Sequence, residues 1–154
     1  MDLRTGALLA RPANGKGGPY APVHNRSYPT ARRQKWKMTE ITFMQVHPIP
    51  TYSNLTALDL VLDKIQEAGL YLMYDMRSTY QNKASVTEQV NRIKSRPNLL
   101  LWYTADEPDG TTDPLNATVI SSNLITSLDG GDGKGGAGYH PVSLVLNCQD
   151  YFFK

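Results

Sequence analysis

The chain has 154 residues, of which 19% are charged, a formal net charge of +2 and a single cysteine. This length suits one domain with a buried core, but it is short of the ~250 residues typical of a complete eight-stranded α/β barrel. One cysteine excludes an internal disulfide, and no apolar run approaches the ~18 residues of a membrane-spanning helix. We therefore expect no membrane partner.

The charge divides the chain into a basic arm and an acidic body. Residues 1–38 carry eight Lys or Arg and one acid, whereas residues 39–154 carry eight Lys or Arg and thirteen acids. The arm is rich in Gly and Pro without apolar periodicity, so we expect it to be disordered. Its basic cluster at 32–37 has no aromatic platform or nucleic-acid motif beside it, which favours a solvated tail and no nucleic-acid partner.

Strand-like and helix-like segments alternate along the body. Leu58, Leu62 and Ile65 follow helical spacing, and Gly69 stands where a helix C-cap glycine is expected. In chain order, the patterns predict a strand at 41–47, a helix at 55–68, a strand at 70–76, a helix at 85–95, a strand from 99, a helix from 114 or 115 to 128, and a strand at 142–147. This alternation predicts an α/β fold with about four parallel strands and three helices.

The strand that starts at Leu99 is the centre of the functional interpretation. Its apolar run ends in Asp106, Glu107 and Asp109, with Pro108 between the last two. Proline cannot continue a strand ladder, so these acids should lie at the carboxyl end of the strand, where α/β folds place their ligands. Ordinary loop and helix-cap chemistry is the alternative explanation for this cluster.

Polar residues also stand at the predicted carboxyl ends of the other strands. They are candidate substrate-binding residues: His47, Asp75, Arg77 and Asn147. Asp75 and Arg77 have a simpler alternative, in which they pair with each other or with loop backbone.

Three segments give the body a resemblance to a known family: residues 46–50, 74–77 and above all 101–108. Residues 41–154 resemble the middle of a glycoside-hydrolase-type (β/α)8 barrel of the kind found in secreted fungal proteins. The resemblance implies a partial barrel that acts on carbohydrate, with Glu107 as the general acid/base. Asp106 replaces the asparagine that normally contacts the sugar 2-hydroxyl and is a further substrate-binding candidate.

The resemblance also implies what this chain lacks. It places the second catalytic carboxylate on the seventh barrel strand, beyond the predicted strands. The competing hypothesis is therefore a non-catalytic α/β fragment or a carbohydrate-binding module. The open edges of a partial sheet would in either case favour self-association.

Several other features have a structural alternative. Trp102 and Tyr103 either stack on sugar rings or belong to the core. The glycine loop 130–138 follows a helix and has no Ser or Thr after Lys134, so it indicates a connector and not a phosphate site. The His residues are scattered and Cys148 stands alone, so we expect neither a metal nor a cofactor.

Three Asn-x-Ser/Thr sequons occur, at Asn25, Asn54 and Asn116. They agree with the extracellular location that the resemblance implies, although Asn54 and Asn116 also stand where helix caps are expected. The first ten residues do not form a convincing signal peptide, so the sequence leaves the location open.

Overall fold

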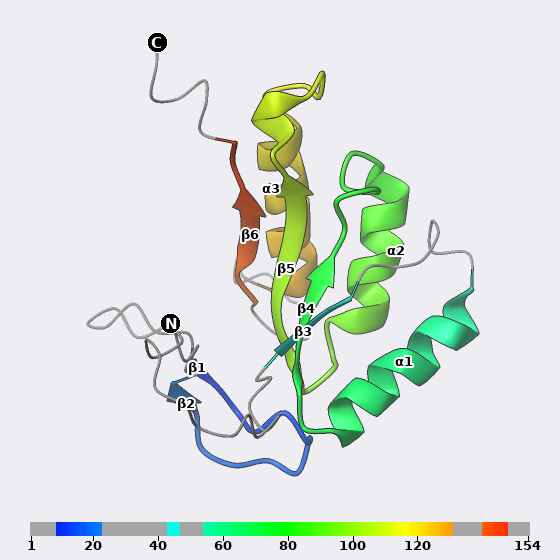
Figure 1. Cartoon of the computed structure of the whole chain (residues 1–154), viewed down its shortest axis with the longest axis vertical. Coiled ribbons are helices and arrows are strands. Elements are labelled where there is room, and N and C mark those ends of the chain that lie inside the picture. Colours follow the sequence, from blue (N-terminus) through cyan, green and yellow to red (C-terminus); the bar gives the residue numbers. More distant parts are fainter. Residues whose placement is uncertain (1–8, 23–42, 47–53, 131–139, 148–154) are drawn as a thin grey trace, which may run out of the picture.

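The computed structural model describes residues 9–22, 43–46, 54–130 and 140–147. Parallel strands in the order β3-β4-β5-β6 form its main sheet, and three helices accompany it (Figure 1). The elements are β3 (Phe43–Val46), α1 (Leu55–Glu67), β4 (Tyr71–Asp75), α2 (Lys83–Ile93), β5 (Leu99–Asp106), α3 (Ala117–Asp129) and β6 (Val142–Val145). The predicted α/β class, with three helices and a parallel sheet, is confirmed. His47 and residues 131–138 of the glycine loop lie outside the described residues.

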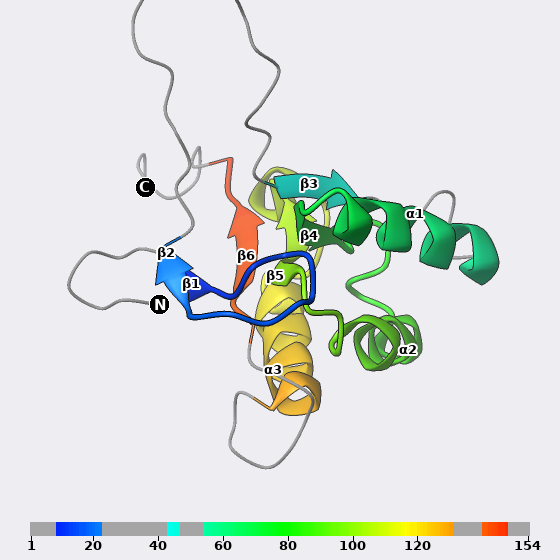
Figure 2. The same ribbon diagram turned by 90° about the horizontal axis from the view of Figure 1, so that it is seen from below.

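The three helices lie on one side of the sheet, which Figure 2 shows in a view from below. The core fills the space between these two layers, because the apolar stripes of the helices meet alternate residues of β4 and β5. Its buried members are Leu62, Ile65, Leu72, Tyr74, Met76, Val86, Val90, Ile93, Leu99, Trp102 and Ile125. Within the described residues, no α-helix covers the opposite face or the carboxyl edge of the sheet.

Trp102 is at the centre of this core and is fully buried. Its ring meets that of Tyr74 edge-on at a centroid distance of 5.9 Å, and its Nε1 donates to Asp129 at 3.1 Å. The same Asp129 oxygen accepts from the backbone N–H of His140 at 2.8 Å. Of the two explanations for Trp102, the structure therefore gives the core residue and not a sugar platform.

Local capping sets where two of the helices begin. The side chain of Asn54 accepts from the N–H of Ala57 at 3.0 Å and caps α1. Asn82 caps α2 in the same way, so this helix begins at Lys83, two residues before the predicted start. No side-chain hydrogen bond caps α3 at Asn116, and this helix starts later than 114 or 115.

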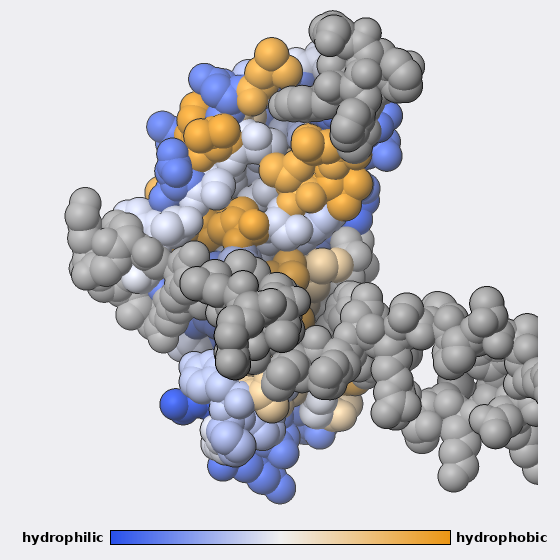
Figure 3. Space-filling view, turned by 90° about the vertical axis from the view of Figure 1, so that its left-hand side faces the viewer, coloured by the Kyte–Doolittle hydropathy of each residue, from blue (hydrophilic) through white to orange (hydrophobic). Residues whose placement is uncertain are grey.

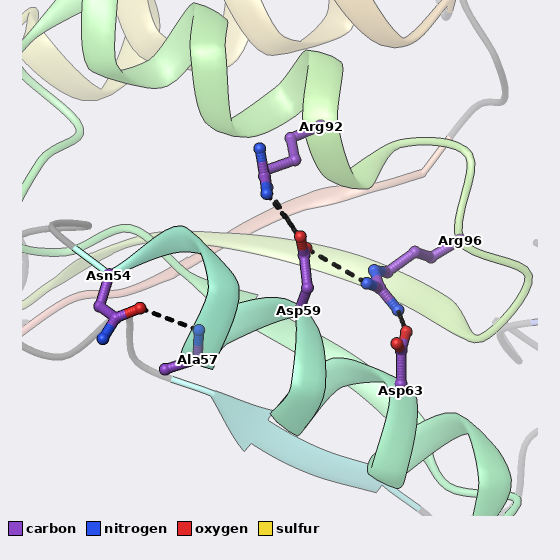
Figure 4. Close-up of polar contacts among 6 residues, drawn as sticks. All are labelled: Asn54, Ala57, Asp59, Asp63, Arg92 and Arg96. Atoms are coloured by element: carbon purple, nitrogen blue, oxygen red, sulfur yellow. Dashed lines mark hydrogen bonds and ion pairs between the residues drawn. The ribbon is translucent and has the colours of Figure 1, made fainter.

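A cluster of ion pairs fixes α1 against α2 (Figure 4). Asp59 pairs with Arg92 and, at 3.4 Å, with Arg96, which also pairs with Asp63 at 2.8 Å. The hydrogen bond from Arg92, with the positive charges of both arginines, lowers the pKa of Asp59. Asp59 and Asp63 therefore mark the side of α1 that faces α2.

Residues 9–22 belong to the arm that we expected to be disordered. They contain β1 (Leu9–Ala10) and β2 (Ala21–Pro22), which pair antiparallel near the amino ends of the main strands (Figure 1). The hydroxyl of Tyr71 donates to the carbonyl of Arg11 at 2.9 Å, and Ala13 is buried. For the rest of residues 1–38, which lies outside the described residues, disorder stays a prediction.

Candidate functional site

The carboxyl end of β5 places Glu107 in an unusual backbone conformation. Its φ of 51° and ψ of 45° are left-handed, and it is the one non-glycine residue with positive φ among the described residues. Its N–H donates to the carbonyl of Val145 at 2.8 Å, and its own carbonyl accepts from Gly110 at 3.0 Å. β6 and the 3-10 turn Pro108–Gly110 thus impose this conformation, which L-residues rarely adopt.

The side chain of Glu107 is exposed at this edge, whereas most of β5 before it is buried. Among the residues that the structure describes, none forms a hydrogen bond or ion pair with its carboxylate. Glycine adopts a left-handed backbone without steric strain, whereas glutamate does so at a cost in free energy. A glutamate at such an exposed position is therefore an indication of function, because glycine would fold there with less strain. Glu107 is therefore the strongest functional candidate at this edge.

Arg77 connects two of the neighbouring acids. Its Nε donates to Asp75 at 2.9 Å, its backbone N–H donates to the other Asp75 oxygen at 2.8 Å, and its Nη1 donates to Asp106. Asp75 is almost fully buried, so Arg77 compensates a charge that water does not reach. The structure thus brings together three predicted site residues, Asp75, Arg77 and Asp106, and their mutual pairing agrees with the structural alternative for the first two.

Tyr103 belongs to the same network. Its hydroxyl donates to Asp106 at 2.8 Å, and the guanidinium of Arg77 lies over its ring at 5.6 Å from the centroid. Burial and, next, the hydrogen bond to Asp106 raise the pKa of Tyr103 to about 12, so the hydroxyl stays a donor at neutral pH. The carboxylate of Asp106 is consequently held by two donors.

Asn147 lies at the same edge, beside the turn that follows Glu107. Its backbone N–H donates to Asp109 at 2.8 Å. A Cβ added to Gly110 would come within 2.7 Å of the Asn147 side-chain nitrogen, so glycine is what allows this close approach. The exposed amide of Asn147 is therefore part of the candidate site, which its place after β6 had suggested.

The sequence did not reveal the hydrogen-bonding roles of two tyrosines near this edge. Tyr103 had been considered only as a stacking or core residue, yet it pairs in register with Asp75 across β4 and β5. Tyr80 donates to Asp113 at 2.6 Å, beyond the carboxyl ends of the same strands. The alternation of side chains along β5 was a usable signal for Tyr103, whereas nothing in the pattern links Tyr80 with Asp113.

In the part of the chain that the structure describes, no cluster of three or more His, Cys, Asp or Glu side chains could hold a metal ion. Nor does any described helix combine the length and apolarity that crossing a bilayer requires.

Comparison with known proteins gives no match to a family model, to a curated protein or to a solved structure.

Proposed function

We propose that the body is part of a glycoside-hydrolase-type (β/α)8 barrel, with about four of its parallel strands, and that Glu107 is the general acid/base for cleavage of a glycosidic bond. The conformation of Glu107 carries this proposal: an exposed acid is held left-handed at the carboxyl end of a buried parallel strand. That edge is where such barrels hold their catalytic groups. The proposal also draws on the likeness of residues 101–108 to the family motif.

The roles of the other acids follow from their partners. Asp75 is buried against Arg77, Asp106 is held by Arg77 and Tyr103, and Asp109 accepts from Asn147. Each of these carboxylates has a positioning partner. At this edge of the sheet, the carboxylate of Glu107 is exposed and has no such partner among the described residues, which suits a group that must give and take a proton.

The reaction needs two carboxyl groups. In its acid form Glu107 would protonate the leaving oxygen as the bond to the anomeric carbon breaks, and a second carboxylate would assist on the opposite face of the sugar. Water finally adds to the anomeric carbon through its oxygen. One of its protons stays in the new hydroxyl group, and the other passes to a carboxylate. Since the neighbouring acids are engaged, the second carboxylate comes from outside the described residues.

A carbohydrate-binding module is the second candidate, and the network around Arg77 favours it. Fixed planar groups such as the Arg77 guanidinium and the Asp106 carboxylate suit sugar hydroxyls, and they need no second carboxylate. Tyr103 is largely buried, so it contributes its hydroxyl to the site and not a ring face on which a sugar could stack. This candidate predicts glycan binding without cleavage.

The test combines a hydrolysis assay with a binding assay on the full chain. A panel of aryl glycosides is given to the native protein, to Glu107→Gln and to Asp109→Asn as a matched control on the neighbouring turn. The proposal expects hydrolysis that Glu107→Gln strongly reduces for aryl glycosides with poor leaving groups and that Asp109→Asn keeps. Glycan binding by calorimetry without any hydrolysis would support the binding module. The absence of both hydrolysis and glycan binding would refute both candidates.

A further inference from the structure

We propose that Asn116 is an N-glycosylation site and that the attached oligosaccharide covers an exposed apolar patch at the start of α3. The patch consists of Leu115, Val119 and Ile120. This inference is independent of the proposed function, because it concerns a modification of the chain and not the acids at the end of β5.

The structure distinguishes between the sequons. Helix capping was the alternative explanation for both Asn54 and Asn116. The side-chain oxygen of Asn54 does cap α1, since it accepts from the N–H of Ala57 at 3.0 Å. The side chain of Asn116 makes no capping hydrogen bond to α3, and Asn116 is exposed. Capping therefore accounts for Asn54 and not for Asn116, while Asn25 lies outside the described residues.

The sequon at Asn116 has every part that an acceptor needs. Thr118 supplies the hydroxyl two residues on, and Ala117 between them is not proline. The backbone carbonyl of Asn116 accepts from the N–H of Ile120 at 3.0 Å, so its backbone already belongs to the first turn of α3. The exposed side-chain amide is what remains for a ligand, and a surface position suits a bulky one.

The side chains around Asn116 expose an unusual amount of apolar surface. Leu115 is 88% exposed, Val119 is 58% exposed and Ile120 is 43% exposed. Apolar side chains that are scattered singly over a surface need no explanation, whereas neighbouring ones indicate a surface that something covers. Figure 3 views the molecule from the side of β6 and shows apolar patches with polar surface between them.

Helix geometry places Asn116 in the middle of the patch. Successive residues of an α-helix are about 100° apart, so Ile120 lies about 40° to one side of Asn116 and Val119 about 60° to the other. Residues three and four apart have Cβ atoms about 5–6 Å from each other. Ser121 and Ile125 are buried on the other side of α3. A group attached to Asn116 is therefore adjacent to both exposed apolar side chains.

An oligosaccharide suits this patch better than a freely diffusing partner does. Sugar rings carry C–H groups on their faces and hydroxyls at their edges, so the first sugar can cover apolar side chains while its hydroxyls stay in water. The covalent bond holds the sugar beside the patch, so even a weak contact is populated. The acceptor amide within the patch is the observation that identifies the occupant.

The modification is a group transfer from an oligosaccharide carried on a lipid diphosphate, performed by the transferase of the secretory pathway. Nδ2 of Asn116 attacks the anomeric carbon of the first sugar. The new N–C bond replaces the C–O bond to the diphosphate, which leaves with the electron pair, and one amide proton passes to a base of the transferase. The acceptor is the unfolded chain, so the place of Thr118 within α3 does not oppose the transfer.

The first experiment secretes the full chain from yeast behind a cleavable leader and examines each sequon by peptide mass spectrometry. Enzymatic removal of N-linked sugars in heavy-oxygen water converts every glycosylated Asn into a labelled Asp. The proposal expects the label at Asn116 in the native chain and in Thr118→Ser, which keeps the sequon. Thr118→Ala should lose it completely. A native chain without the label at Asn116 would overturn the proposal.

The second experiment tests whether the glycan covers the patch. An anilinonaphthalene-sulfonate dye binds exposed apolar surface, and circular dichroism checks that every variant is folded. Thr118→Ala should bind more dye than the native chain. Thr56→Ala is the matched control, because it removes the sequon of Asn54 by the same substitution at an exposed position, and it should leave dye binding unchanged.

Variants of the patch complete the second experiment. When Leu115→Ser and Val119→Ser are present, Thr118→Ala should no longer increase dye binding. The same increase in this background, or an equal increase in Thr56→Ala, would show that the glycan does not cover the patch and would overturn the proposal. The readouts are peptide mass and dye binding, so failure here is distinct from failure of the hydrolase proposal.

Discussion

Glu107→Asn should stabilise the protein although it removes the candidate catalytic group. Glu107 holds a φ of 51°, a conformation that costs an L-residue roughly 1–2 kcal/mol. Asparagine adopts this region several times more readily than other non-glycine residues, and it does not add the backbone entropy of glycine to the unfolded chain. The side chain is exposed, so the substitution removes no packing.

We expect the free energy of unfolding to rise by about 1 kcal/mol, which corresponds to a rise in Tm of about 2–4 °C for a domain of this size. Glu107→Gly should gain less, because glycine loses about 0.5–1 kcal/mol more to backbone entropy. Glu107→Gln is the control, since it removes the charge and keeps the strain. Urea denaturation followed by circular dichroism gives the free energy of unfolding of the three variants. They are compared at the same dependence of this free energy on urea concentration.

The comparison of Glu107→Asn with Glu107→Gln decides the outcome. If Asn is no more stable than Gln, the backbone at this position is not strained and the structural argument for a functional acid is refuted. If Asn is more stable, the native chain keeps an acid at a position where another residue type would fold better. That cost is characteristic of functional sites.

Three further predictions concern the ion pairs, the buried tyrosine and the turn. Because the pKa of Asp59 is lowered by its pairing with Arg92, Asp59 contributes stability above its ordinary value of 3.8 that is lost as the pH falls further. Asp59→Asn should reduce this acid loss in denaturation curves between pH 2 and 6, and an unchanged loss would contradict the pairing. The pKa of Tyr103 is raised to about 12, so the unfolded chain ionises first and stability falls as the pH rises from 10 to 12. Tyr103→Phe should reduce this alkaline loss, and a loss identical to that of the native chain would show that Tyr103 is exposed. Gly110→Ala forces the side-chain nitrogen of Asn147 away from a Cβ at 2.7 Å, which should change stability by less than about 0.5 kcal/mol but weaken glycan binding in calorimetry. Unchanged binding would remove Asn147 from the site.

The fold class could be read from the sequence because the two periodicities are clear. Helical spacing in 55–68 and the apolar run from Leu99 each have one straightforward interpretation. The helix starts were less certain, since the cap at Asn82 competes with the equally plausible Ser85. The pairing within residues 9–22 carried no apolar pattern, and its contact with Tyr71 joins residues sixty positions apart.

The candidate site was predictable in its position and not in its geometry. Parallel strands gather their carboxyl ends, so Asp75, Arg77 and Asp106 could be expected at one edge. The left-handed backbone of Glu107 could not be predicted from the sequence, because a residue before proline is normally extended. It depends on the hydrogen bond to Val145 of β6, which is a tertiary contact.

The central claim is that Glu107 donates the proton to the leaving group, and the dependence of the rate on that leaving group tests it most directly. kcat/KM is measured for aryl glycosides with poor and with strongly activated phenols, for the native chain and for Glu107→Gln. Acid catalysis by Glu107 predicts a loss of about 10²- to 10⁴-fold on the poor leaving groups and little loss on the activated ones. An equal loss on both, or none on either, would contradict it.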